Sequence, residues 1–232
     1  MDPVNDLKRL VSEGLVEDIR QIEESLVLQQ QIRNSAEGIN RADLGPLFGR
    51  FQPVLARYAV IASVRLFDPP DDQYPSRSIP TILNHMRFTA DYLNIVHRES
   101  IIERLISFGH ERQQFEGIPD QWITQLVRKE FHDHLPLRAD PDSGELSDAL
   151  DALHSLKDKP IAHSEEVQID DEWKNCDQPI RLLCDYAIDF AVTVGKGYLN
   201  QDYRLDGSTS IFRLDADRTL EMMKMLMGKI GI

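Results

Sequence analysis

The segment from Lys157 to His163, Lys-Asp-Lys-Pro-Ile-Ala-His, holds the residues best suited to chemistry. Six positions separate Lys157 from His163, which on an ideal helix leaves them about 120° apart around the axis and about 9 Å apart along it. Pro160 interrupts the helical hydrogen-bond ladder and disfavours α geometry at the residue before it. A kink or helix end here would let the Lys157 amine return toward the His163 imidazole. The alternative is an ordinary helix terminus, where cationic side chains interact favourably with the negative end of the helix.

A second set, formed by Asp151, His154 and Asp158, has spacings of three and four residues. On a helix these spacings place all three side chains on one face. Two carboxylates and an imidazole are ligands that suit a divalent metal ion. The solvated polar face of an amphipathic helix explains the same pattern, so both interpretations stay open.

The other histidines make weaker candidates for a metal site. His132 and His134 flank Asp133, but residues two apart on a helix point in different directions. His97 and His110 have no partner that the sequence identifies. We therefore expect these four histidines to lie on the surface or in the core without binding a metal.

Two further pairs of residues favour structural roles. Arg65 and Asp68 lie near the end of a predicted helix, where they either pair with each other or anchor the following loop to another helix. Cys176 and Cys184 are eight positions apart on or beside one predicted helix, which holds their sulfur atoms too far apart for a disulfide. Two thiols alone make no zinc site, and we expect them to be reduced and at least half-buried.

Apolar spacing predicts helices over nearly the whole chain. Asp2 is a predicted N-cap, and the stretch 34–45 reads as a loop. Helices are predicted over about 3–33, 46–66, 78–86, 91–114, 119–131, 145–158, 177–194 and 214–227, with 211–214 as a short extended piece. No repeat or linker divides the sequence. We therefore predict an all-α protein, a single compact bundle of about seven to eight helices in one domain spanning residues 1–232.

Composition narrows the class of protein. The 232 residues are 41% hydrophobic and 28% charged, as is typical of a globular protein. No apolar run approaches the roughly 20 residues of a membrane span, and the acidic N-terminus does not resemble a secretory signal, so we expect a cytoplasmic location. The formal net charge of −13 argues against a broad nucleic-acid-binding surface but leaves room for a narrow local site.

Two motifs resemble those of known proteins. The segment 157–163 resembles the motif of HEPN ribonucleases, which has an arginine, a polar residue, a few variable positions and a histidine. The string Arg-Leu-Phe-Asp-Pro at 65–69, followed by Ser-Ile-Pro at 78–80, resembles the AbiU-type HEPN-like family associated with bacterial abortive infection. The resemblance covers most of the chain in layout and rests on these two short motifs.

The resemblance implies a HEPN-like helical fold and a metal-independent endoribonuclease of phage defence or of a toxin–antitoxin system. His163 matches the catalytic histidine, Asp158 the polar residue, and Lys157 the arginine. Lysine keeps the positive charge of arginine but lacks its bidentate contact to phosphate. In such a site the 2′-hydroxyl of RNA is the nucleophile, His163 takes its proton, Lys157 stabilises the charged transition state, and Asp158 orients His163.

The expected partners follow from this interpretation. We predict a homodimer, because one His163 per chain supplies one acid–base group and a two-fold axis supplies a second. The resemblance implies an RNA substrate bound in a local cleft and a possible antitoxin protein, with no cofactor. The alternative function is a non-catalytic HEPN-like module that binds a nucleotide or a protein partner. The polar residues around His163 lead us to expect that its side chain is partly accessible in a groove.

Overall fold

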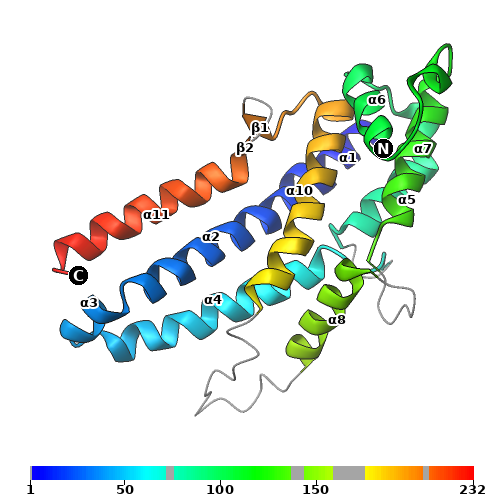
Figure 1. Ribbon diagram of the computed structural model, residues 1–232. Coiled ribbons are helices and arrows are strands. Elements are labelled where there is room, and N and C mark those ends of the chain that lie inside the picture. The colour runs from blue at the N-terminus through cyan, green and yellow to red at the C-terminus, as the bar shows by residue number, and fades with distance from the viewer. Residues whose placement is uncertain (1, 72–75, 137–143, 159–175, 206–208) are drawn as a thin grey trace.

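The computed structural model describes residues 2–71, 76–136, 144–158, 176–205 and 209–232, and these residues form an all-α fold (Figure 1). Its long helices are α1 (Pro3–Leu10), α2 (Val16–Asn34), α4 (Gly45–Arg65), α5 (Ile79–Thr89), α6 (Arg98–Ser107), α7 (Asp120–Asp133), α8 (Glu145–Asp158), α10 (Asp177–Leu199) and α11 (Ile211–Lys229). Shorter pieces are the π-helical η1 (Val11–Leu15), the helix α3 (Ala36–Arg41), the 3₁₀ turns η2 (Ala90–Tyr92) and η3 (Arg112–Phe115), and the paired strands β1 (Arg204–Leu205) and β2 (Thr209–Ser210).

The N-terminal helix continues from α1 into α2 through the π-helical turn η1. The predicted cap is confirmed, because the Asp2 side chain accepts a hydrogen bond from the Val4 amide at 3.0 Å. Core residues then recur every four positions. In a regular helix of 3.6 residues per turn, residues at this spacing would drift steadily around the helix and leave the buried face. The π turn has more residues per turn than an α turn, and so it corrects the drift. As a result, one face stays buried across the join at Leu7, Val11, Leu15 and Ile19.

The main core forms where α2, α4, α10 and α11 pack together. Helix α2 lies between α4 and α11 (Figure 1). Helix α10 carries a long buried face, which includes Leu183, Ala187, Phe190 and Val194. At the junction with α7, the Phe131 ring meets the Phe190 ring edge-on, with centroids 5.0 Å apart. This core fixes the body of the protein, against which α5, α7 and α8 are placed.

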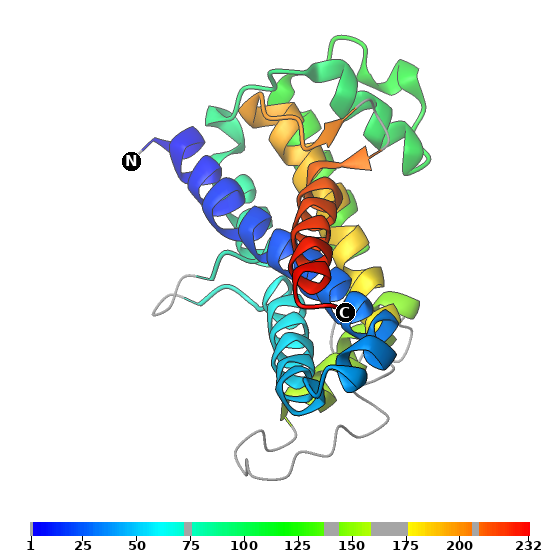
Figure 2. The same ribbon diagram turned by 90° about the vertical axis from the view of Figure 1, so that its left-hand side faces the viewer.

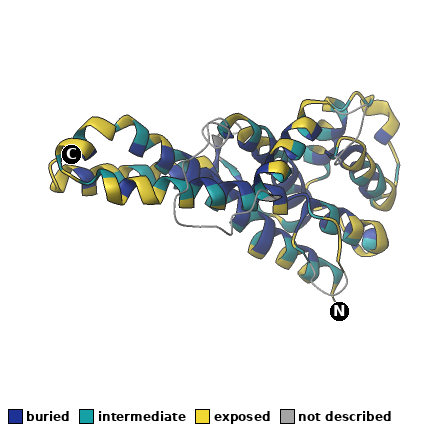
Figure 3. Ribbon diagram, turned by 90° about the horizontal axis from the view of Figure 1, so that it is seen from below, coloured by how far each residue is buried: buried dark blue, intermediate teal, exposed yellow. Residues whose placement is uncertain are grey.

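One end of the molecule is a narrow extension that we call the arm. It consists of α2 residues 26–34, α3, α4 residues 45–58 and α11 residues 219–229, which run side by side away from the body (Figures 1 and 3). A small separate cluster of buried residues holds its tip together, formed by Ile32, Ile39, Phe48 and Met227. The arm is therefore only three helices wide and has a thin core of its own.

Two predicted segments differ from the structure. The expected loop at 34–45 contains α3, and the helix expected over 91–114 is wrong. In its place α6 is preceded by an extended segment, where the Val96 amide donates to the Gly197 carbonyl at 2.7 Å. Gly109, with a φ of 100°, follows the end of α6 in a conformation that favours glycine. Leu93 and Ile95 are thus buried from an extended segment, in which Val96 is 51% exposed.

Several large aromatic side chains are exposed. Tyr92 is 68% exposed, and on α4 Phe51 and Tyr58 are about half exposed. The predicted extended piece at 211–214 is also wrong, because α11 begins at Ile211. Within the described parts of the chain, no helix has both the length and the apolar character needed to cross a bilayer.

Candidate functional site

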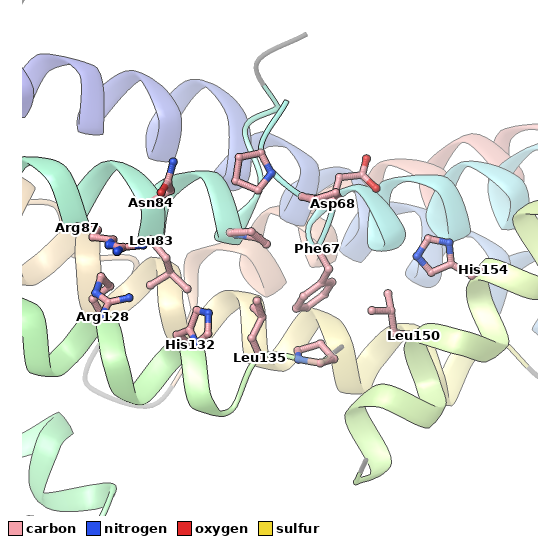
Figure 4. A pocket seen from close by; sticks show the side chains of 14 residues that line it. Phe67, Asp68, Leu83, Asn84, Arg87, Arg128, His132, Leu135, Leu150 and His154 are labelled. Carbon is pink, nitrogen blue, oxygen red and sulfur yellow. The ribbon is translucent and has the colours of Figure 1, made fainter. Parts of the chain in front are cut away.

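A pocket of about 530 Å³ lies where α5, α7 and α8 meet the loop after α4 (Figure 4). It brings together parts of the chain that are distant in sequence. Its lining consists of Phe67, Asp68, Pro69, Pro70, Pro80, Leu83, Asn84, Arg87, Arg128, His132, Leu135, Pro136, Leu150 and His154. The pocket therefore combines apolar side chains with several cationic or titratable ones.

Hydrogen bonds between two sequence motifs build one wall of the pocket. Ser78 caps α5, and its hydroxyl donates to the Asp68 carbonyl at 2.6 Å. The Ile79 amide donates to the Leu66 carbonyl at 2.8 Å. The strings at 65–69 and 78–80, which the sequence analysis singled out, therefore lie against each other. Their apolar and proline residues form the middle of the pocket together with Leu83 (Figure 4).

The Arg65 side chain pairs with neither Asp68 nor the following loop but with another helix. Its guanidinium Nη2 lies 3.4 Å from Oδ2 of Asp18 on α2, and the contact between Arg65 and Asp68 is a backbone hydrogen bond. Burial raises the pKa of the Asp18 carboxyl, and the Arg65 charge opposes that rise. Arg65 thus anchors the end of α4 to α2, while Asp68 remains at the pocket.

The basic end of the pocket is formed by Arg87, Arg128 and His132 (Figure 4). Arg128 Nε donates to the side-chain carbonyl of Gln125 at 3.1 Å, and the Arg87 guanidinium lies over the Phe88 ring at 5.6 Å from its centroid. Neither arginine forms an ion pair with any carboxylate in the described residues. In a protein of strongly negative net charge, two such guanidinium groups at one pocket favour an anionic ligand.

The helices that carry these arginines supply no competing carboxylate. The α5 sequence contains no acidic residue. The three acidic residues of α7 are each engaged elsewhere: Asp120 pairs with Arg98, Glu130 with His110, and Asp133 with Lys129. The Asp133–Lys129 hydrogen bond lowers the pKa of the Asp133 carboxyl and raises the pKa of the Lys129 ammonium. No carboxylate on α5 or α7 therefore neutralises the positive charge of Arg87 and Arg128.

The other end of the pocket leads to the predicted catalytic segment. His154 lines the pocket from α8 (Figure 4), and half-buried Lys157 follows it by about one helical turn without being a lining residue. Asp158 is the last residue of α8, but its side chain lies outside the described residues, as does the whole of His163. The structure thus connects the pocket to the start of the predicted motif, and the convergence of Lys157 with His163 stays a prediction.

The alternative metal sites are not assembled among the residues that the structure describes, which contain no group of three His, Cys, Asp or Glu side chains placed for a metal. His97 hydrogen-bonds Asn200 and His134 hydrogen-bonds the Glu130 carbonyl, each at 2.7 Å. Asp151 and His154 are described, but their predicted third partner Asp158 is not.

The two cysteines are free and buried, as expected. Cys184 lies 3.8 Å from the Glu23 carboxylate, and burial is the main cause that raises its thiol pKa well above the usual value. Burial also raises the pKa of Cys176 to about 11. Both thiols are therefore protonated at neutral pH, which makes them poor nucleophiles.

Exposed aromatic side chains lie next to the basic end of the pocket. Phe88 is 71% exposed, Trp122 is 67% exposed, and Tyr92 is similarly open. Trp122 lines a neighbouring hollow of about 340 Å³ that also contains Arg128, so this arginine borders both hollows. Gln125 joins the two helices here by donating from its side-chain nitrogen to the Arg87 carbonyl at 3.2 Å.

Arg87, Arg128 and Trp122 stand in no motif that the sequence pattern singles out. A signal was nonetheless present, because 79–89 lacks acidic residues in an acidic chain and places Arg87 beside a phenylalanine. What the sequence could not show is that α5 and α7 lie antiparallel, which brings the two arginines together.

Compared with known proteins, the chain matches no family model, no curated protein and no solved structure.

Proposed function

We propose that this protein binds single-stranded RNA at the pocket between α5, α7 and α8, and cleaves it with the segment that begins at Lys157. The observation that supports this most directly is the pair formed by Arg87 and Arg128, which open into one pocket without a carboxylate partner among the described residues. Guanidinium groups suit the phosphates of a nucleic-acid backbone, because their planar donors match phosphate oxygens.

The neighbouring aromatic side chains favour a single strand over a duplex. Bases of single-stranded RNA are free to stack on exposed rings, and such stacking contributes about 1–3 kcal/mol per base. Trp122 and Phe88 are exposed beside the two arginines. Surfaces that bind single-stranded nucleic acid usually combine cationic side chains with exposed aromatic rings. Phe67 and Leu83 line the apolar middle of this pocket, whose volume is about 530 Å³, and could hold a nucleobase between them.

Cleavage follows from the resemblance to HEPN ribonucleases and from the position of α8. A strand held at Arg87 and Arg128 would pass His154 toward the end of α8. There Lys157 would stabilise the developing phosphate charge, and His163 would take the 2′-hydroxyl proton, with Asp158 orienting the imidazole. A second copy of the chain would supply the acid that protonates the leaving 5′-oxygen. An antitoxin that covers the pocket would silence this activity.

The test of cleavage uses purified protein and a single-stranded RNA in the presence of EDTA. We expect products with a 2′,3′-cyclic phosphate and no cutting of the matching DNA, which lacks the 2′-hydroxyl. His163→Ala should lower the rate by roughly 10²–10⁴-fold. Lys157→Arg should retain or raise the rate, since it restores the bidentate contact. Full activity of the His163→Ala protein would contradict the assignment.

The test of binding is independent of cleavage. In the His163→Ala background, Arg128→Ala should weaken RNA binding by about 10-fold or more. It should also lower the slope of the logarithm of affinity against the logarithm of salt concentration by about one, which corresponds to one lost phosphate contact. Arg41→Ala is the matched control, because Arg41 is an exposed arginine on α3, at the far end of the molecule, and should have no effect. Unchanged affinity of the Arg128→Ala protein would contradict the pocket as the binding site.

The second candidate function is a non-catalytic module that binds a nucleotide. Lys157 in place of the family arginine favours it, because a lysine gives up the bidentate phosphate contact. This candidate predicts nucleotide binding that depends on Arg87 and Arg128, with no RNA cleavage by the wild type or by Lys157→Arg. Cleavage by either protein that requires His163 would exclude it.

A further inference from the structure

A second hollow lies beside the pocket between α5, α7 and α8 and shares one residue with it. We call it the Trp122 hollow. Its volume is about 340 Å³, and its lining consists of Phe115, Ile118, Trp122, Ile123, Gln125, Leu126, Arg128 and Lys129. Arg128 also lines the larger pocket, whose apolar middle contains Phe67 and Leu83. One arginine side chain thus borders two apolar spaces.

Hydrogen bonds hold the Arg128 side chain between the two spaces. Long side chains on a helix lean toward its N-terminus, and Arg128 Nε donates to the side-chain carbonyl of Gln125, one turn earlier on α7, at 3.1 Å. The Gln125 side-chain nitrogen donates in turn to the Arg87 carbonyl on α5 at 3.2 Å. The two terminal nitrogens of Arg128 make no hydrogen bond within the part of the chain that the structure describes. They therefore remain available for two parallel hydrogen bonds to a phosphate.

The Trp122 hollow has the composition of a site for a flat aromatic ligand. Trp122 itself is 67% exposed, while Phe115 and Ile123 behind it are almost completely buried. None of the lining residues is acidic, and Lys129, which pairs with Asp133, adds a second cation at the rim. An exposed ring beside cationic groups suits a nucleobase that stacks on the ring and carries its phosphate at the edge.

The segment that precedes α7 fixes the shape of this hollow. The Arg98 guanidinium donates to the carbonyls of Phe115 at 3.1 Å and Ile118 at 2.6 Å, and it also pairs with Asp120 at the start of α7. One arginine thus ties both lining residues of this segment to the beginning of the helix. The hollow is therefore formed before any ligand binds, which keeps the cost of ordering it low.

The spacing along α7 suits one nucleotide between the Trp122 ring and Arg128. Gln125, which holds the Arg128 side chain, is three residues from Trp122, or about 4.5 Å along the helix axis and about 60° around it. The ribose of a single nucleotide can span such a gap. A phosphodiester has two ester arms, so the second arm of a phosphate on Arg128 would lead into the larger pocket.

We infer that the Trp122 hollow is a second base subsite, and that the protein recognises a dinucleotide step of single-stranded RNA. One base lies between Phe67 and Leu83 in the larger pocket, the adjacent base stacks on Trp122, and the phosphodiester that joins them binds Arg128. This inference rests on the proposed function, to which it adds the unit of recognition. A mononucleotide fills only one of the two spaces and should bind less tightly.

Tryptophan fluorescence reports directly on this subsite. The sequence contains two tryptophans, so Trp173→Phe in the His163→Ala background leaves Trp122 as the only one and prevents cleavage. Titration with a short single-stranded oligoadenylate should quench this emission, because a base stacks on the indole. An abasic strand of the same length keeps the phosphates but has no bases, and it should bind more weakly and without quenching.

The affinity for labelled strands, measured by fluorescence anisotropy, gives the size of the effect. In the His163→Ala background, Trp122→Ala should weaken oligoadenylate binding by roughly 5–150-fold, as expected for one stacked base, and leave abasic-strand binding unchanged. Trp122→Phe should retain most of the affinity. Phe51→Ala is the matched control, because Phe51 is an exposed phenylalanine on the arm. The arm lies at the other end of the molecule from α6, η3 and the start of α7 (Figures 1 and 2).

A dinucleotide tests whether the two spaces act together. The dinucleotide ApA should bind the His163→Ala protein at least about 10-fold more tightly than adenosine 3′-methyl phosphate, which has the same phosphodiester but one base. Trp122→Ala should bring this ratio close to one. RNA binding that requires Arg128 but is unchanged by Trp122→Ala would overturn the second subsite and leave the proposed function standing. Absence of RNA binding, or binding that Arg128→Ala does not weaken, would overturn both.

Discussion

Arg104 and Asp189 form a half-buried ion pair between α6 and α10 whose removal makes a quantitative test of the fold. The Arg104 guanidinium donates to Asp189, whose side chain is 23% exposed, and Arg204 approaches the same carboxylate at 3.3 Å. Arg104 also lies over the Phe108 ring at 4.3 Å from its centroid. Burial raises the pKa of the Asp189 carboxyl, and both arginines oppose that rise.

Replacing Arg104 by methionine keeps most of the side-chain volume and removes the charge. Loss of one partner from a fully buried ion pair costs about 3–5 kcal/mol. Because this pair is about a quarter exposed and Arg204 stays close to Asp189, we expect its loss to cost about 2 kcal/mol. The contact with Phe108 contributes about 0.5–1 kcal/mol. We therefore expect Arg104→Met to lower the free energy of unfolding by about 3 kcal/mol at pH 7.

The loss should depend on pH in a defined direction. The folded pKa of Asp189 is raised, so the folded state holds this proton more tightly than the unfolded state. The stability that Asp189 contributes is then greatest at low pH and falls as the pH rises through its folded pKa. Removing Arg104 raises that pKa further, because a lowering influence is gone. The difference between Arg104→Met and wild type should consequently be small near pH 4 and grow toward pH 7.

Urea denaturation of wild type, Arg104→Met, Asp189→Asn and the double variant, each at pH 4 and pH 7, measures this. In the Asp189→Asn background, Arg104→Met should cost only about 1 kcal/mol at either pH, since no charge is left unpaired. Arg104→Lys should retain part of the stability at pH 7. An equal loss at both pH values, or an undiminished loss in the Asp189→Asn background, would refute the reasoning.

Further predictions concern packing, thiols and catalysis. Gly197→Ala should lower the free energy of unfolding by about 1–3 kcal/mol in a thermal or urea melt, because the new Cβ would lie 2.3 Å from the Ile101 side chain. Gly49→Ala, in open space within α4, should instead be neutral or stabilise by up to about 1 kcal/mol. Neither Cys176 nor Cys184 should react with a disulfide reagent at pH 8 in the folded protein, and both should react in urea; rapid reaction without denaturant would contradict their burial.

The sequence predicted most helices because the apolar period is strong along α2, α7 and α10. The cap at Asp2 marked one helix start correctly, and the helix predicted from 78 begins at Ile79 with Ser78 as its cap. The failure at 91–114 has a tertiary cause: the carbonyl of Gly197, a residue about a hundred positions later, offers a hydrogen bond that holds residue 96 in extended form. No local pattern reports such a partner.

The candidate site was predicted only in part. The motifs at 65–69 and 78–80 were singled out, and both lie at the pocket. Arg87 and Arg128 were missed, because their importance arises from the antiparallel packing of α5 on α7. Phe51 and Tyr58 lie on an apolar face of α4, and periodicity identifies such a face but not whether the same chain covers it.

The π-helical turn η1 has a consequence for insertions and deletions. Its extra backbone length lets Leu7 and Ile19 point into one core although they are separated by three four-residue steps. Deleting a single residue between 11 and 15 would leave a perfectly good α-helix in local terms. It would also rotate everything before the turn by about 100°, carrying Leu7 out of the core. The N-terminal ten residues are thus held in phase with the rest of the protein by the length of one turn, so that a change in residue count there matters more than a change in residue type.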